Sequence, residues 1–146
     1  MRLKLILLLL SAVLSLGGEL AVPVPGEINA IVPVHSGRGK SCGFTFTLHP
    51  GNDLEITWLA LPRRCPVAVE RPDGKLIRKN ESRYFRELPP AASSDEFSRA
   101  LQPSLVLQLQ GAEAVPGRYR VLMGPMPLWG KVSCTMVIAA PPQKAE

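Results

Sequence analysis

Short segments that alternate between apolar and polar residues recur along this chain, separated by turns rich in proline and glycine. The clearest segment places Phe44, Phe46 and Leu48 on one side and threonines on the other. Alternation with a period of two is typical of a strand with one buried face. The 146 residues include 15 Pro and 12 Gly without a fixed period, which favours short elements and many turns.

The spacing of these segments predicts the fold. Strands are expected over residues 28–34, 44–48, 54–61, 65–70, 75–79, 105–109, 118–123 and 131–139. Strand follows strand without intervening helices, and a proline-rich loop interrupts the rhythm between residues 81 and 102. This pattern predicts an all-β domain over residues 28–140. We expect a single antiparallel β-sandwich, jelly-roll or immunoglobulin-like, of about seven to eight short strands.

The first 17 residues have the layout of a secretory signal peptide. Arg2 and Lys4 precede a leucine-rich run, and Ser15-Leu16-Gly17 offers small residues at the positions that a signal peptidase reads. The run ends before the roughly 20 apolar residues that a membrane-spanning helix needs. We therefore expect a secreted or periplasmic protein with a signal peptide over 1–17, an extended linker over 18–27 and a disordered tail over 141–146. No membrane span is expected after cleavage.

The charge of the chain bears on its partners. Cleavage would remove Arg2 and Lys4 and lower the formal net charge from +5 to +3. The remaining cations are spread among strands and turns, whereas nucleic-acid binding favours a denser basic stripe. We expect no nucleic acid as a partner. An unknown protein or polysaccharide in the cell envelope or outside the cell is expected instead, and the oligomeric state stays open.

The chain has three cysteines: Cys65 and Cys134 lie in predicted strands, and Cys42 shares the alternation of Phe44 and Phe46 just before the strand at 44–48. In an oxidising compartment two of them are expected to pair. The side-chain alternation allows all three to face one core, so it does not select a pair. The first and last core strands of a sandwich are often neighbours, and on that ground we predict a Cys42–Cys134 disulfide with Cys65 left over.

Several motifs follow one another in a familiar order between Phe44 and Val121. A strand and a turn lead to Leu54-Glu55-Ile56-Thr57-Trp58, then come the Pro72-Asp73-Gly74 turn and the strand Gly117-Arg118-Tyr119-Arg120-Val121. This order resembles the bacterial pre-peptidase C-terminal domain. The resemblance implies a β-sandwich and an accessory binding role beside secreted enzymes. The chain departs from that family at Arg63-Arg64, where the family is usually acidic, and in its extra loop Leu88–Ser94, so no calcium or substrate role is implied.

Trp129 is the principal candidate for a binding residue. It lies with Leu128 in a loop of prolines and glycines, and exposed aromatic side chains often anchor protein contacts. The alternative is that Trp129 closes one end of the core. Together with Leu88, Pro89 and Pro90 of the proline-rich loop, these residues form the predicted contact surface. The predicted function is a non-enzymatic binding or accessory module.

Two other functions remain open. A small secreted hydrolase or metal-binding protein would use His49, Asp53 and Cys65, and the cations beside Cys65 would lower its thiol pKa. A purely structural component of the envelope is the other. No catalytic site, metal site or cofactor is predicted, because the chain has only two histidines and no zinc-type cysteine spacing.

Overall fold

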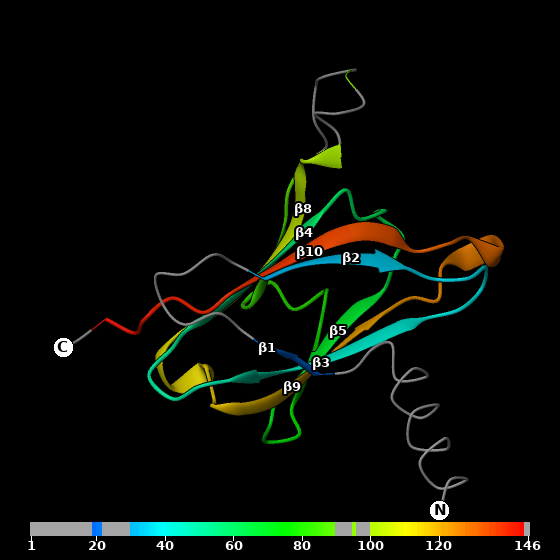
Figure 1. Ribbon diagram of the computed structural model, residues 1–146. Coiled ribbons are helices and arrows are strands. Elements are labelled where there is room, and N and C mark those ends of the chain that lie inside the picture. Colours follow the sequence, from blue (N-terminus) through cyan, green and yellow to red (C-terminus); the bar gives the residue numbers. More distant parts are fainter. Residues whose placement is uncertain (1–18, 22–29, 90–94, 96–99, 145–146) are drawn as a thin grey trace, which may run out of the picture.

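The protein folds into two β-sheets packed face to face, as Figure 1 shows. The computed structural model describes residues 19–21, 30–89, 95 and 100–144. Within these residues ten strands are divided equally between two five-stranded sheets. The predicted all-β sandwich is therefore confirmed. The predicted signal peptide over 1–17 lies outside the described residues.

The two sheets have a simple order. The first sheet contains, from edge to edge, β1 (Glu19–Ala21), β3 (Cys42–Leu48), β9 (Gly117–Met123), β5 (Val67–Glu70) and β6 (Leu76–Arg78). The second contains β2 (Ala30–His35), β10 (Ser133–Ala139), β4 (Leu54–Leu59), β8 (Pro103–Leu109) and β7 (Phe85–Glu87). Neighbouring strands run antiparallel except β1 and β3, which are parallel. Two 3-10 turns, η1 (Gly111–Glu113) and η2 (Pro127–Trp129), lie in connections between strands.

The alternating pattern that predicts the strands also builds the core. Leu54, Ile56 and Trp58 of β4 are almost completely buried, while the residues between them are partly exposed. Across the interface, the Trp58 Nε1–H donates a hydrogen bond to the Met123 sulfur at 3.3 Å. This bond joins the second sheet to the first. It also satisfies the indole donor, which would otherwise be costly to bury.

Two strands of the structure lie in segments where the sequence predicts none. β1 falls in the expected linker and pairs with β3, with Glu19 opposite Thr45. β7 falls in the expected proline-rich loop and pairs with β8, where Phe85 packs on Trp58 at 5.8 Å between ring centroids. Each has three residues, which is too short to display a period of two. Their neighbours in the sheets define them.

The C-terminal residues correct another prediction. Pro142 forms a β-bridge with Asn52, and the Gln143 backbone N–H donates to the Gly51 carbonyl at 2.9 Å. The Gln143 side chain also donates to the carbonyl of Gly111 at 3.1 Å. Residues 141–144 are thus bound to the sandwich instead of forming part of the predicted disordered tail, because they satisfy carbonyls of the facing loops. Residues 145–146 lie outside the described part.

The predicted Cys42–Cys134 disulfide is not formed, and all three cysteines are free thiols in the structure. The prediction assumed neighbouring strands. Cys42 instead lies in β3 of the first sheet, opposite Met123, whereas Cys134 lies in β10 of the second sheet, opposite Val34. Burial raises the pKa of the Cys134 thiol to about 12. A thiol with so high a pKa is a poor nucleophile at neutral pH.

The strand directions separate the loops into two ends. The connections 36–41, 60–66 and 124–132 lie at one end, which we call the Trp129 end. The turns 49–53, 71–75 and 110–116 lie at the other, which we call the Glu113 end. In Figure 1 η2 (orange) marks the first and η1 (yellow) marks the second. Each site described below lies at one or the other of these two ends.

Candidate functional site

The loop that carries Leu128 and Trp129 projects from the Trp129 end. The two residues are 90% and 76% exposed. Both have left-handed backbone angles, with φ of 57° and 60°. Such a conformation is uncommon for residues other than glycine and costs on the order of 1–3 kcal/mol for each residue. Because Trp129 is exposed and not buried in the core, the alternative prediction, in which Trp129 closes one end of the core, is wrong.

Hydrogen bonds to the neighbouring loop hold this segment in place. The Gly39 N–H donates to the Gly130 carbonyl at 3.1 Å, and the Val132 N–H donates to the Ser36 hydroxyl at 2.8 Å. The Ser36 N–H returns a bond to the Val132 carbonyl at 2.9 Å. The Trp129 ring lies against Gly39, and a β-carbon added to Gly39 would be 3.6 Å from the ring atoms Cδ2 and Cε3. These contacts hold the backbone that follows Trp129 against residues 36–39, and they place the Trp129 ring against Gly39.

Cations occur in both of the loops that meet at Trp129. Arg38 and Lys40 come from residues 36–41 and Lys131 from residues 124–132, and neither segment contains an acidic residue. All three cations are exposed. Within the described part of the chain, none of them forms a hydrogen bond or ion pair through its side chain. The sequence analysis did not single out these three residues, although the absence of acidic residues from both loops could have identified them.

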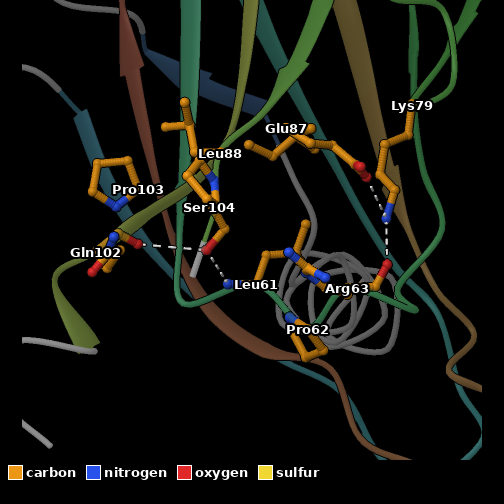
Figure 2. A pocket seen from close by; sticks show the side chains of 11 residues that line it. Leu61, Pro62, Arg63, Lys79, Glu87, Leu88, Gln102, Pro103 and Ser104 are labelled. Carbon is orange, nitrogen blue, oxygen red and sulfur yellow. Dashed lines mark hydrogen bonds and ion pairs between the residues drawn. The ribbon is translucent and has the colours of Figure 1, made fainter. Parts of the chain in front are cut away.

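A pocket of about 380 Å³ opens beside the connection between β4 and β5 (Figure 2). Of the residues predicted as contacts, Leu88 and Pro89 line it, and Pro90 lies outside the described residues. Leu61 and Leu105 form its buried floor. The strand order places this pocket beside β4, β8 and β7, whereas the Trp129 loop connects β9 to β10 and contacts the connection between β2 and β3. The predicted contact surface is thus divided between two sectors of the same end.

The hydrogen bonds around this pocket shape its walls. The Leu61 N–H donates to the Ser104 hydroxyl at 3.1 Å. The Lys79 ammonium donates to the carbonyls of Arg63 at 2.6 Å and Cys65 at 3.0 Å, and it lies 3.4 Å from a Glu87 carboxylate oxygen. These bonds connect the β4–β5 connection to β8 and to the segment after β6. The pocket is therefore part of the hydrogen-bonded framework.

The residues of the alternative catalytic site are not brought together. His49 and Asp53 lie at the Glu113 end, where Asp53 accepts a hydrogen bond from the Gly111 N–H at 2.9 Å. Cys65 is fully buried at the Trp129 end. Burial raises the pKa of the Cys65 thiol, and this outweighs the opposing effects of a hydrogen bond from Gly124 and the nearby Lys79 charge. The expected low pKa of Cys65 is therefore wrong.

Glu113 organises the charges at the opposite end. Its carboxylate accepts hydrogen bonds from the Tyr84 hydroxyl at 2.7 Å, from Arg83 at 2.6 Å and from Arg71 at 3.2 Å. Arg71 also pairs with Asp73 through both carboxylate oxygens. The hydrogen bond from Tyr84 is the largest influence that lowers the pKa of Glu113. Since these groups satisfy one another, this end offers few free charges to a partner.

Neither a metal-binding group of side chains nor a membrane-spanning helix is observed among the described residues. No three or more His, Cys, Asp or Glu side chains in residues 30–89 and 100–144 are grouped so that they could hold a metal ion. No helix in the described part of the chain is both long and apolar enough to cross a membrane.

Comparisons with known proteins identify similar structures. No family model matches the chain, and the search of curated proteins found no match to its sequence. Its fold is similar to that of a mutant of PliG-Ec, a periplasmic lysozyme inhibitor of g-type lysozyme from Escherichia coli. The TM-score is 0.50 with 10% sequence identity over 85% of this chain and 98% of that chain.

Two further inhibitors of g-type lysozyme have lower scores. PliG of Aeromonas hydrophila has a TM-score of 0.47 and 14% identity, over 84% of this chain and 97% of that chain. PliG of Salmonella Typhimurium has a TM-score of 0.48 and 8% identity, over 85% of this chain and 99% of that chain. At these identities, similarity to solved structures establishes the β-sandwich fold and nothing further.

Proposed function

We propose that this chain is a non-enzymatic binding protein that acts outside the cytoplasm and inserts its Trp129 loop into a cleft of a protein partner. The observation that carries the proposal is the conformation of Leu128 and Trp129. Both are exposed, and both adopt left-handed angles that disfavour their side chains. Strain of this kind, kept at the surface by a network of hydrogen bonds, is typical of functional segments.

The fixed loop suits binding for an energetic reason. A side chain that is ordered before association loses less conformational entropy when the complex forms. Trp is also enriched among residues that dominate binding energies, because its large apolar surface fills a pocket on the partner. Leu128 and Trp129 present such a surface. The hydrogen bonds of Gly39 and Ser36 hold the loop that carries this surface in place before a partner binds.

The surrounding charges indicate the chemistry of the partner. Arg38, Lys40 and Lys131 would attract a cleft lined by carboxylates, and complementary charge increases the rate of association. Glycoside hydrolases place a pair of carboxylates on either side of the bond that they cleave. An apolar loop bordered by cations would fit such a cleft and exclude the substrate from it.

These features support a g-type lysozyme as the partner. The mutant inhibitor from Escherichia coli, whose structure has a similar fold, is described as an inhibitor of this class of enzyme. A cleft with catalytic carboxylates is what the cations of the Trp129 loop would complement. The function that we propose is therefore inhibition of g-type lysozyme in the periplasm or outside the cell.

The test measures lysis of peptidoglycan by a g-type lysozyme with increasing amounts of the protein, with a c-type lysozyme as the comparison enzyme. We expect inhibition of the g-type enzyme, and Trp129→Ala should weaken binding by about 30-fold, as expected for a central anchor. Leu76→Ala is the matched control, because Leu76 is an exposed leucine on β6, away from the loop.

Each result has a defined meaning. Undiminished inhibition by Trp129→Ala would exclude this loop as the contact. Equal inhibition of both lysozymes would contradict specificity for the g-type enzyme. Binding to anionic vesicles or to heparin without inhibition of lysozyme would show that the basic loop recognises an anionic surface, and it would overturn the proposal.

A further inference from the structure

The pocket beside the β4–β5 connection has stiff walls. Pro62, Pro89 and Pro103 line it above the buried side chains of Leu61 and Leu105. A proline ring fixes one backbone angle, so these walls lose little freedom when a ligand enters. The volume of about 380 Å³ lies at the small end of the range for ligand sites. The pocket is therefore suited to a small molecule with an aliphatic portion.

Two of the polar groups in the pocket already have partners. Lys79 uses its three donors on the carbonyls of Arg63 and Cys65 and on Glu87. The Ser104 hydroxyl accepts a bond from the Leu61 N–H and lies 3.5 Å from the Gln102 carbonyl. These groups hold the walls together and leave few donors for a ligand.

Arg63 differs from these groups. Its side chain lines the pocket, and Figure 2 shows it running back beside Leu61. Within the described residues, its guanidinium makes no hydrogen bond or ion pair. Its backbone carbonyl, by contrast, is fixed by Lys79 at 2.6 Å. An exposed guanidinium with no partner among the described residues is thus attached to an anchored backbone at the edge of a pocket whose walls combine proline and leucine with polar groups.

This combination defines the chemistry of a ligand. A guanidinium presents parallel N–H groups that match the two oxygens of a carboxylate, and such charge-assisted pairs are the stronger hydrogen bonds in proteins. The proline and leucine walls would take an aliphatic group next to that carboxylate. We propose that this pocket binds a small aliphatic carboxylate through Arg63, independently of the contact made by the Trp129 loop.

The experiment uses isovalerate as the probe and follows backbone amide signals of the protein by NMR. Isovaleramide has nearly the same shape without the charge. We expect saturable shifts at Leu61 and Ser104 with isovalerate and binding of isovaleramide that is weaker by about tenfold or more. Arg63→Gln should weaken isovalerate by a similar factor. It leaves the backbone carbonyl that Lys79 binds.

Arg64→Gln is the matched control, because Arg64 carries the same charge next in sequence but does not line the pocket. It should bind isovalerate as the unsubstituted protein does. Equal weakening by both substitutions would mean that only the general positive charge matters, and it would overturn the proposal. Equal binding of acid and amide, or no saturable shift at all, would overturn it as well. Inhibition of lysozyme by Arg63→Gln should be unchanged, which separates this site from the proposed function.

Discussion

The two ends of the sandwich differ in whether their charged side chains form ion pairs. At the Glu113 end, Arg71, Arg83 and Asp73 are tied to one another or to Glu113 by ion pairs of 3.2 Å or less. At the Trp129 end, the loops 36–41, 60–66 and 124–132 contain five cations and no acidic residue. Within the described residues these five side chains have no partners. One end satisfies its polar groups internally, while the other leaves charge and apolar surface free.

The backbone shows the same contrast. The turn at 71–75 uses Gly74 for its positive φ of 88°, so the strain is relieved by the residue type. The Trp129 loop instead places Leu128 and Trp129 in left-handed conformations. A protein gains no stability from exposed apolar side chains in strained positions. The contrast therefore fits a Glu113 end that stabilises the fold and a Trp129 loop that makes the proposed contact with a partner.

The largest effect on stability is expected from Tyr84→Phe at the Glu113 end. The Tyr84 hydroxyl donates to Glu113 at 2.7 Å and accepts from Lys75 at 3.0 Å, while its ring is almost buried. Loss of hydrogen bonds to charged partners should lower the free energy of unfolding by about 2 kcal/mol. Urea denaturation measures it. A change within error would mean that this network is not what stabilises the end.

The opposite sign is expected from Leu128→Gly at the Trp129 end. Leu128 is 90% exposed with a φ of 57°, so glycine loses little packing and removes the strain. Stability should rise by up to about 1 kcal/mol, while affinity for the lysozyme partner falls. Denaturation and the inhibition assay are measured on the same sample. A loss of stability would show that the loop contributes to the fold.

Acid should weaken the Glu113 end. The pKa values of Glu113 and Asp73 are lowered in the fold, mainly by hydrogen bonds from Tyr84 and Arg71 respectively. A lowered pKa means that the stabilisation is present above the unfolded value and is lost as the pH falls through the folded one. The Tm should therefore fall between about pH 5 and about pH 3. Glu113→Gln should flatten that slope, and an unchanged slope would contradict the assignment.

The smallest effect is expected from Lys131→Gln. Lys131 borders the Trp129 loop and has no partner among the described residues, so its loss should leave the Tm unchanged. The association rate with the lysozyme should fall by about two- to fivefold at low salt, and the difference should vanish at high salt. Surface plasmon resonance at two salt concentrations measures this. An effect mainly on dissociation would indicate a buried ion pair instead.

Much of the fold could be predicted from local patterns, and the site only in part. Eight predicted strands overlap β2 to β6 and β8 to β10. Seven of them are long enough to show the alternation, and the three-residue β6 could be located as the hairpin partner that follows the Pro72-Asp73-Gly74 turn. Trp129 could be identified as a candidate from its proline and glycine neighbours. Its exposure could not, since that depends on bonds to Ser36 and Gly39, some 90 residues earlier in the chain.

The sequence by itself determined the all-β class, the positions of the longer strands and the absence of acidic residues from the loops around Trp129. Alternation and turn chemistry are local properties, so they can be detected without knowing the fold. Only the tertiary structure decided that Cys42 and Cys134 lie in different sheets and that Arg63 lines a pocket with Pro89 and Pro103. Such relations join residues far apart in the chain, and they exist only once the strand order is fixed.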